Sequence, residues 1–170
     1  MRKLLFESLF QSALTEPAPT RDDAALAELA KSLERTARRR LGRSLSIREV
    51  DAGSCNGCEL EIHALNNVLY DLERFGIRFV ASPRHADVLL VTGPVTANMR
   101  EALERTYQAT PHPKWVVAVG DCGAGCGVFE GSYACIGAVS KIVPVDLVIR
   151  GCPPTPMELM RGLTWLLTRP

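Results

Sequence analysis

The sequence predicts an α/β fold in which strands and helices alternate to build a largely parallel, doubly wound sheet. The first observation is a series of short apolar runs with strand character, at residues 44–50, 77–81, 87–93, 114–120 and 145–151. The second is that segments with helical spacing separate several of these runs, as parallel strands require. The third is the composition, because 170 residues with 46% hydrophobic and 23% charged content form one globular domain with a sizeable core.

The first 42 residues differ from the rest, and we expect them to form a helical extension to a main domain at residues 43–170. Apolar residues recur at helical spacing from Leu5 to Leu14, "EPAPT" interrupts the pattern, and a second helical stretch covers residues 21–41. The apolar stripe is typical of a core or a subunit interface. The basic run at residues 35–43 fits a solvated helix end, and the alternative is a contact with anionic lipid or an acidic partner.

Three further helices are predicted in the main domain. Residues 59–75 form a helix that Gly76 terminates, and residues 97–109 form the next one. The apolar side of the first helix comprises Leu60, Ala64, Leu65, Val68, Leu69 and Leu72. The last helix starts with Thr155 as N-cap, Pro156 in the first turn and Glu158 completing a capping box.

Composition excludes several classes of function. A formal charge of +1 gives no general field for binding nucleic acid. No apolar run approaches the roughly 18–20 residues of a membrane helix, and no secretory signal is recognised. No Gly-x-Gly-x-x-Gly or Walker motif indicates a nucleotide site. Six cysteines are then expected in a reducing cytoplasm, where metal binding or catalysis is more common than disulfides.

Four cysteines follow directly after predicted strands. Cys55 and Cys58 lie in "DAGSCNGCELE", Cys122 lies in "GDCGAGCG", and Cys152 lies in "RGCPP". Because ligands of a parallel sheet bind at the carboxyl ends of its strands, we expect these thiols at one edge. The glycines around them allow the backbone to approach closely, and Pro153 and Pro154 stiffen the last turn.

Four thiols can hold a [4Fe–4S] cluster or a zinc ion, and the Cys-x-x-Cys pair could also be a redox dithiol. Structural zinc usually uses two short knuckles, whereas here two ligands arrive singly from distant loops. The pattern therefore favours a cluster. Cys126 is an alternative ligand to Cys122, and we expect Cys135 to be a buried structural thiol on a helix of small residues.

Several motifs occur in an order that resembles a known family, over about residues 43–168. They are "DAGSCNGCELE", "PRHADVLLVTGPVT", "WVVAVGDCGAGCGVF", "SYACIGAVSKIVPVDLVIRGCPPTP" and the closing helix. This set resembles the small subunit of group 4, energy-converting [NiFe] hydrogenases and the homologous 20 kDa subunit of respiratory complex I. The resemblance implies a flavodoxin-like domain with helices on both faces of its sheet. It also implies one [4Fe–4S] cluster, whose ligands map onto Cys55, Cys58, Cys122 and Cys152.

The spacing within the first motif discriminates between branches of the family. Complex I subunits have adjacent cysteines here, whereas this chain has Cys55 and Cys58 separated by two residues. That favours an electron-relay subunit of a formate hydrogenlyase or hydrogenase-4 type complex over a quinone-reducing, complex I-type one. A structural zinc protein of flavodoxin-like shape, acting as a binding module, is the alternative of another class.

The resemblance also implies a particular setting for the chain. The partners would be a large subunit, a ferredoxin-like iron–sulfur subunit and integral membrane subunits, which residues 1–42 would help to contact. The chain would lie peripherally at the cytoplasmic face of the inner (plasma) membrane. A [NiFe] centre or a quinone would belong to the large partner or to the interface with it.

Residues near the cysteines receive secondary roles. Glu59 fits either a carboxylate stabilised by the helix dipole or, by the resemblance, part of the interface and a proton path. Arg150 could raise the potential of the cluster, or it could be an exposed arginine at a strand end. Thr92, Gly93 and Pro94 are expected to line the large-subunit contact, and the three histidines, His63, His85 and His112, are expected to be structural or solvent-facing.

Overall fold

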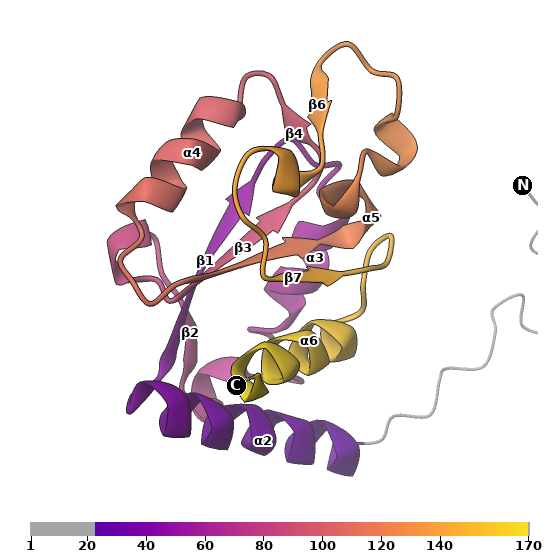
Figure 1. The fold of residues 1–170 in the computed structure, drawn as a ribbon. Helices are drawn as coiled ribbons and strands as arrows, with labels where there is room; N and C mark the ends of the chain where they lie inside the picture. Colours follow the sequence, from indigo (N-terminus) through magenta and orange to yellow (C-terminus); the bar gives the residue numbers. More distant parts are fainter. Residues whose placement is uncertain (1–22, 170) are drawn as a thin grey trace, which may run out of the picture.

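The computed structural model describes residues 23–169, and its centre is a parallel sheet of five strands (Figure 1). The strands are β1 (Leu45–Asp51), β2 (Ile77–Phe79), β3 (Val88–Thr92), β5 (Trp115–Val119) and β7 (Leu147–Ile149). Their order in the sheet is β2-β1-β3-β5-β7, and every neighbouring pair is parallel. Counted along the chain this is the 2-1-3-4-5 order of flavodoxin-like folds, so the predicted fold class is confirmed.

Helices cover both faces of the sheet. One face packs against α2 (Asp23–Leu41), α3 (Gly57–Ala64) and α6 (Pro156–Thr168), and the other against α4 (Arg100–Ala109). Alternate residues of β3 enter the two cores: Val88 and Leu90 join the first, Leu89 and Val91 the second. Each leucine buried in this way stabilises the fold by about 1.5–3 kcal/mol, which explains why the central strands are continuous apolar runs.

Helix α2 packs on the main domain. Ala30, Leu33 and Ala37 on one side of α2 are buried in the first core. The guanidinium of Arg40 lies 5.2 Å from the centroid of the Trp115 ring and donates hydrogen bonds to the carbonyls of Leu167 and Arg169. Part of the basic run thus fastens α2 to the end of α6. The predicted helix around residues 5–14 lies outside the described residues.

Helix α3 is shorter than predicted, because the chain turns at Asn67. The Asn67 side-chain oxygen accepts hydrogen bonds from the backbone N–H groups of Leu69 (2.8 Å) and Tyr70 (3.0 Å), and this local turn competes with a continued helix. A short 3₁₀ helix, η1 (Leu72–Phe75), follows and ends at Gly76. The predicted apolar side is therefore wrong in part. Three of its members, Leu60, Val68 and Leu69, are exposed.

The prediction for Cys135 is also wrong. Cys135 is partly exposed and begins strand β6 (Cys135–Gly137), which pairs antiparallel with β4 (Val95–Thr96). The small residues around Cys135 form this two-stranded sheet beside the main one, because they give the segment no apolar side of helical spacing to bury.

The last helix starts as predicted. The Thr155 hydroxyl accepts a hydrogen bond from the Glu158 N–H (3.3 Å), and the Glu158 carboxylate accepts one from the Thr155 N–H (2.8 Å). Pro156 occupies the first turn, and Met160, Leu163, Leu166 and Leu167 are buried beneath the helix. Within residues 23–169, no helix combines the length and the apolar character needed to cross a membrane.

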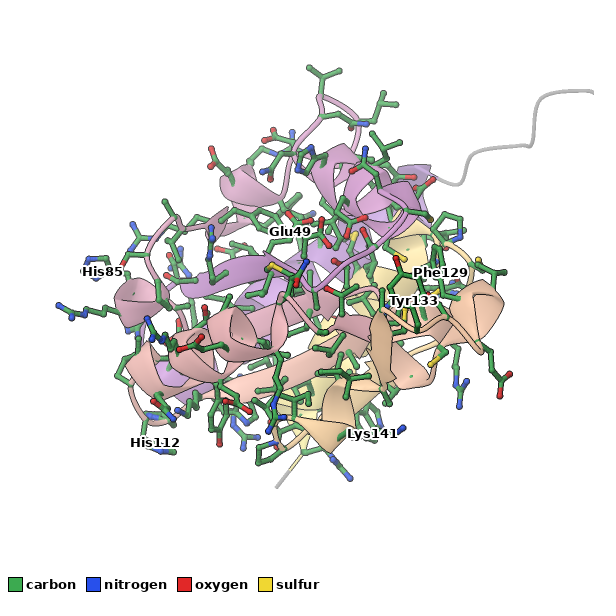
Figure 2. All side chains as sticks on the ribbon, turned by 90° about the horizontal axis from the view of Figure 1, so that it is seen from above. Glu49, His85, His112, Phe129, Tyr133 and Lys141 are labelled. Carbon is green, nitrogen blue, oxygen red and sulfur yellow. The ribbon has the colours of Figure 1, made fainter. Side chains whose placement is uncertain are left out.

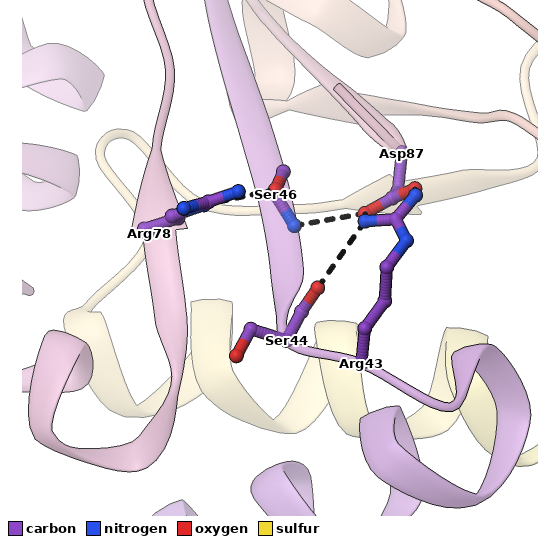
Figure 3. Close-up of polar contacts among 5 residues, drawn as sticks. All are labelled: Arg43, Ser44, Ser46, Arg78 and Asp87. Atoms are coloured by element: carbon purple, nitrogen blue, oxygen red, sulfur yellow. Dashed lines mark hydrogen bonds and ion pairs between the residues drawn. The ribbon is translucent and has the colours of Figure 1, made fainter. Parts of the chain in front are cut away.

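The amino end of the sheet is held by one buried carboxylate (Figure 3). Asp87, just before β3, accepts hydrogen bonds from both terminal nitrogens of Arg43, at 2.9 and 2.5 Å, and from the Ser46 N–H at 2.9 Å. Its backbone N–H also donates to the Ser46 carbonyl at 2.8 Å. Asp87 therefore joins the start of β3 to the start of β1.

Candidate functional site

Three strand-end loops bring four cysteines to the carboxyl end of the sheet. Cys55 lies in the loop after β1, and Cys58 lies in the first turn of α3. Cys122 lies in α5 (Gly120–Ala124), which starts directly after β5, and Cys152 follows β7. Figure 1 shows α3, α5 and the loop after β7 together at this end of the molecule.

The three loops approach one another closely at glycine positions. A Cβ atom on Gly120 would lie 2.7 Å from the Cys58 sulfur and 3.4 Å from the Gly151 carbonyl oxygen. The Asp121 N–H donates to the Gly151 carbonyl (2.9 Å), and the Gly151 N–H donates to the Asp121 carboxylate (3.3 Å). A Cβ on Gly57 would lie 3.5 Å from the Cys55 sulfur and 4.0 Å from Pro153. The loops thus pack as one unit.

The first loop is ordered by its own polar side chains. The Asp51 carboxylate accepts hydrogen bonds from the backbone N–H groups of Gly53 (2.7 Å) and Ser54 (2.8 Å). The Ser54 hydroxyl accepts one from the Asn56 N–H (3.1 Å), and Asn56 adopts the left-handed conformation directly before α3. These bonds fix the direction in which the loop presents Cys55.

Residues 92–94 lie beneath this loop. Thr92, Gly93 and Pro94 are all buried within the chain, and a Cβ on Gly93 would lie 2.7 Å from the Ser54 backbone. They therefore support the loop from below. We expected them to line the large-subunit contact, but all three are buried within this chain.

The four thiols are near enough to influence one another electrostatically. Burial raises the pKa of Cys58 to about 12, and negative charge on Glu59, Cys122, Cys55 and Cys152 adds to the rise. Burial also raises the pKa of Cys122, against a hydrogen bond from the Val128 backbone, and Cys152 and Cys55 raise it further. Cys126 and Cys135 are partly exposed.

These shifts favour a positively charged group among the thiols. The raised pKa values of Cys58 and Cys122 mean that these two thiols keep their protons more tightly than usual unless a cation compensates the charge of their thiolates. Bound iron supplies such a charge and deprotonates the thiols that it binds.

The residues present fit an iron–sulfur cluster. The donor set is four soft thiols, and glycine backbone lies against two of them: Gly120 at Cys58 and Gly127, whose Cβ would lie 2.7 Å from the Cys122 sulfur. In residues 23–169, no three His, Cys, Asp or Glu side chains gather closely enough to hold one metal ion.

Glu59 is a buried carboxylate next to this site. Its residue is 6% exposed, and neither of its carboxylate oxygens has a hydrogen-bond partner among the described residues. It lies in the first turn of α3, where the helix dipole favours a negative charge. A buried polar group without a partner is uncommon and indicates a missing group, water or chain.

The other predicted residues lie at the surface. Arg150 is exposed, and its Nη1 atom lies 3.8 Å from the Asp121 carboxylate, which itself bonds the loop holding Cys152. His63, His85 and His112 are exposed, as Figure 2 shows for the last two at the rim of the molecule. Figure 2 also shows Phe129 and Tyr133 on the segment between α5 and β6, where Tyr133 is fully exposed.

Glu49 is a notable residue that the sequence reasoning missed. It lies on β1, its Oε1 atom is buried without a partner in the described chain, and charge on Glu59 contributes to raising its pKa. A signal was present, because two consecutive charged residues, Arg48 and Glu49, lie between the apolar residues Ile47 and Val50 of this strand.

Comparison with known proteins identifies relatives of the chain. A formate hydrogenlyase subunit 7 of Escherichia coli is 45% identical over 151 residues, which are 89% of this chain and 58% of that protein. A probable membrane-bound hydrogenase subunit of Pyrococcus furiosus is 46% identical over 129 residues, covering 76% of this chain and 77% of that one. An uncharacterized protein of Methanocaldococcus jannaschii is 48% identical over 121 residues, covering 71% and 81%. The chain thus spans little more than half the length of the first of these relatives.

A solved structure shares the fold. It is a chain of the membrane-bound sulfane sulfur reductase, an archaeal respiratory membrane complex, with a TM-score of 0.66 and 38% sequence identity. The match covers 80% of this chain and 73% of that one. The family of NADH ubiquinone oxidoreductase, 20 Kd subunit, matches residues 55–166, a segment that starts at the first cysteine of the site. The resemblance seen in the motifs is confirmed: the chain belongs to the family of the 20 Kd subunit of NADH ubiquinone oxidoreductase.

Proposed function

We propose that this chain is the electron-transfer subunit of a membrane-associated, energy-converting [NiFe] hydrogenase of the formate hydrogenlyase or hydrogenase-4 type. It would carry one [4Fe–4S] cluster on Cys55, Cys58, Cys122 and Cys152. The observation that carries the proposal is the contact among three strand-end loops that bring four thiols to one end of the sheet. The branch is supported by two relatives that are named as hydrogenlyase and hydrogenase subunits.

The chain's own residues would position the cluster and exclude water. The cluster supplies one-electron chemistry, while the protein sets its place and its potential. The hydrogen bonds of Asp51 to its loop and of Asp121 to Gly151 hold the ligand loops in register. Gly120 and Gly127 let the backbone approach the sulfur atoms, and the Val128 backbone would stabilise negative charge on Cys122 by its hydrogen bond.

Glu59 would act at the boundary between this chain and the large subunit. Its unpartnered carboxylate lies beside Cys58, and a large-subunit donor could complete its hydrogen bonds. We propose that Glu59 belongs to this interface and contributes to a proton path there.

The partners and location follow from the same reasoning. They would be a large subunit that holds the [NiFe] centre, a ferredoxin-like iron–sulfur subunit that exchanges electrons, and integral membrane subunits. Residues 1–42 would contribute to those contacts as a helical extension. The chain would lie peripherally at the cytoplasmic face of the membrane, attached through its partners. Its relatives from Pyrococcus and from the sulfane sulfur reductase are named as parts of membrane-bound proteins.

A second function is a relay of the complex I type, which passes electrons to quinone at the interface with the large subunit. The family match favours it, because that family is named for NADH ubiquinone oxidoreductase. The Cys-x-x-Cys spacing at Cys55 and Cys58 favours the hydrogenase branch instead.

The test is anaerobic purification of the native assembly, followed by assay of iron, sulfide, nickel and zinc. We expect about four iron and four sulfide in this subunit, as one cubane requires, and nickel in the large partner. The same cluster without nickel would transfer the proposal to the quinone-linked branch. Zinc without sulfide in this subunit would refute both.

A further inference from the structure

The second half of β1, residues 48–51, has an open edge where β2 has already ended. Strand β2 pairs with β1 only from Leu45 to Ile47, and Figure 1 shows it beside the first part of β1 alone. The last bond on this side runs from the Val80 N–H to the Ile47 carbonyl (2.8 Å). Within residues 23–169, no strand pairs with this side of β1 after Ile47.

Backbone groups of β1 point toward this open edge. Successive residues of a strand direct their N–H and C=O groups to opposite neighbours. Ile47 bonds toward β2, whereas the Ala52 N–H donates to the Thr92 carbonyl of β3 (3.1 Å). Glu49 and Asp51 alternate in step with Ile47, so their backbone groups face the open edge. An unpaired strand edge of this kind is a template on which another strand can pair.

A pocket of about 460 Å³ lies along the open edge. Helix α3 forms one wall and the end of β2 another. Arg48 and Glu49 both line the pocket, although the side chains of successive strand residues point to opposite faces of a sheet. The pocket therefore reaches around the edge of β1 from one face to the other. Its lining residues are Arg48, Glu49, Ile62, His63, Asn66, Phe79, Val80 and Ala81.

One buried polar atom on each face lacks a partner in residues 23–169. They are the Nε atom of Arg48, a donor, and the Oε1 atom of Glu49, an acceptor. Figure 2 labels Glu49 on β1, and its other oxygen, Oε2, lies 3.6 Å from the His63 Nε2 atom. Because buried polar groups are normally paired, an occupant of this pocket should offer an acceptor to Arg48 and a donor to Glu49.

We propose that an extended segment of a partner subunit adds a strand to the open edge of β1. Its backbone bonds with the N–H and C=O groups of Glu49 and Asp51. One basic side chain of the segment pairs with Glu49, and the acidic side chain next to it accepts from Arg48. Neighbouring side chains of a strand point to opposite faces, so a basic and an acidic neighbour reach the two groups together.

Charge complementarity selects this occupant. A purely apolar ligand would leave both buried atoms without a partner, at the cost of two unpaired polar groups. The inference goes beyond the proposed function, because it concerns a different surface. It requires a partner subunit, as the proposed function does, but neither a cluster nor nickel.

The experiment compares backbone hydrogen exchange in the full chain alone and in the native assembly. Mass spectrometry with electron-transfer fragmentation resolves single amides. We expect the amides of Glu49 and Asp51 to exchange at least about tenfold more slowly in the assembly. The amides of Arg48 and Val50 face β3, so they should be slow in both forms. This alternation distinguishes an added strand from a partner that only packs on side chains.

Two charge reversals test the side-chain pairing. Glu49→Lys sets a positive charge against the basic residue of the partner, so the partner that copurifies should fall below about half of its normal amount. Arg48→Glu should act in the same way on the acidic neighbour. Glu101→Lys, at an exposed position on α4 over the other face of the sheet, is the matched control and should leave the yield unchanged.

The exchange measurement needs no variant, so it decides the proposal even where a charge reversal prevents folding. Equal exchange of the Glu49 and Asp51 amides in both forms would overturn the proposal. Slower exchange confined to α3 would overturn it as well, because the partner would then cover the helix without adding a strand. An assembly that lacks iron and sulfide but protects these two amides would refute the proposed function and support this inference.

Discussion

The two ends of the sheet differ in the hydrogen bonding of a buried carboxylate. At the amino end Asp87 is 2% exposed, and it accepts hydrogen bonds from both terminal nitrogens of Arg43 and from the Ser46 N–H. At the carboxyl end Glu59 is 6% exposed, and neither of its oxygens has a partner among residues 23–169. The amino end is complete within this chain. The carboxyl end is arranged for groups that another molecule or a cofactor supplies.

The largest effect is expected when one of the four thiols at the carboxyl end of the sheet is replaced. Cys58→Ser removes one of the four proposed cluster ligands, so we expect nearly all iron and sulfide to be lost from the purified subunit. Iron assay and visible absorption measure this. Cys126→Ser is the matched control, because Cys126 lies in the same loop as Cys122 and is not one of the four proposed ligands. Loss of the cluster in Cys126→Ser, with retention in Cys122→Ser, would exchange the two assignments.

The next prediction concerns the close approach of the Gly120 backbone to the Cys58 sulfur. Gly120→Ala places a Cβ 2.7 Å from the Cys58 sulfur at a φ of +81°, and we expect less than half of the normal iron content. Gly131 has nearly the same φ, +82°, and open space around it. Gly131→Ala therefore carries the same backbone cost of about 1–2 kcal/mol without the contact. Equal iron content in the two variants would show that the approach to Cys58 is unimportant.

The sequence allowed the sheet and its cysteine edge to be predicted because both depend on local patterns. Apolar runs such as residues 87–93 and 114–120 gave the central strands, and the position of each cysteine after a strand gave the edge. The capping box at Thr155 was readable for the same reason, since all its atoms come from four consecutive residues.

The errors lie where the outcome depends on contacts distant in sequence or on competing local bonds. The long helix predicted at residues 59–75 ends at Ala64, and the Asn67 side chain bonds the backbone of the turn that follows. Cys135 joins a strand because residues 95–96 are there to pair with it. The isolation of Glu59 and the pocket at Glu49 could not be predicted, because both depend on how α3 packs against β1 and on where β2 ends.

The third prediction concerns the hydrogen bonds of Asp87 at the amino end of the sheet. Asp87→Asn weakens the bonds to Arg43 and leaves charge unmatched, so we expect the free energy of unfolding to fall by about 2 kcal/mol. The Arg43 side chain is 57% exposed, and solvent limits the loss. Urea denaturation of the full chain measures it. Asp71→Asn is the control, because its ion pair with Arg74, 3.7 Å long, is solvent-exposed and contributes less than about 1 kcal/mol. Equal losses in both variants would contradict a special role for Asp87.

A smaller effect is expected at Glu158, a carboxylate near the carboxyl end that does have hydrogen-bond partners. Thr155→Ala removes the N-cap of α6, directly after the Cys152 turn, and should cost about 1 kcal/mol. Hydrogen bonds from Thr155 lower the pKa of Glu158 below its usual 4.5, so this stabilisation is present above about pH 4.5 and is lost as pH falls through the lowered pKa.

Urea denaturation at pH 7 and at pH 3 tests this. The free energy of unfolding that Thr155→Ala loses relative to the unaltered protein should be smaller at pH 3. Thr106→Ala, in the middle of α4, serves as control, since its hydroxyl bonds the Ala102 carbonyl and caps nothing. If Thr155→Ala loses the same free energy of unfolding at both pH values, the stabilisation by the cap does not depend on the charge of Glu158.

The smallest expected effect is the sharpest test of the comparison. Glu59→Gln removes a buried charge that has no partner in the described chain, so the isolated subunit should keep its stability or gain up to about 1 kcal/mol in urea denaturation. The same change from acid to amide at Asp87 costs stability, because there the charge is bonded. In the proposed hydrogenase assembly, by contrast, Glu59→Gln should reduce hydrogen-evolving activity or the amount of large subunit that copurifies. A loss above 1 kcal/mol in the isolated subunit would mean that Glu59, like Asp87, already serves the fold of this chain.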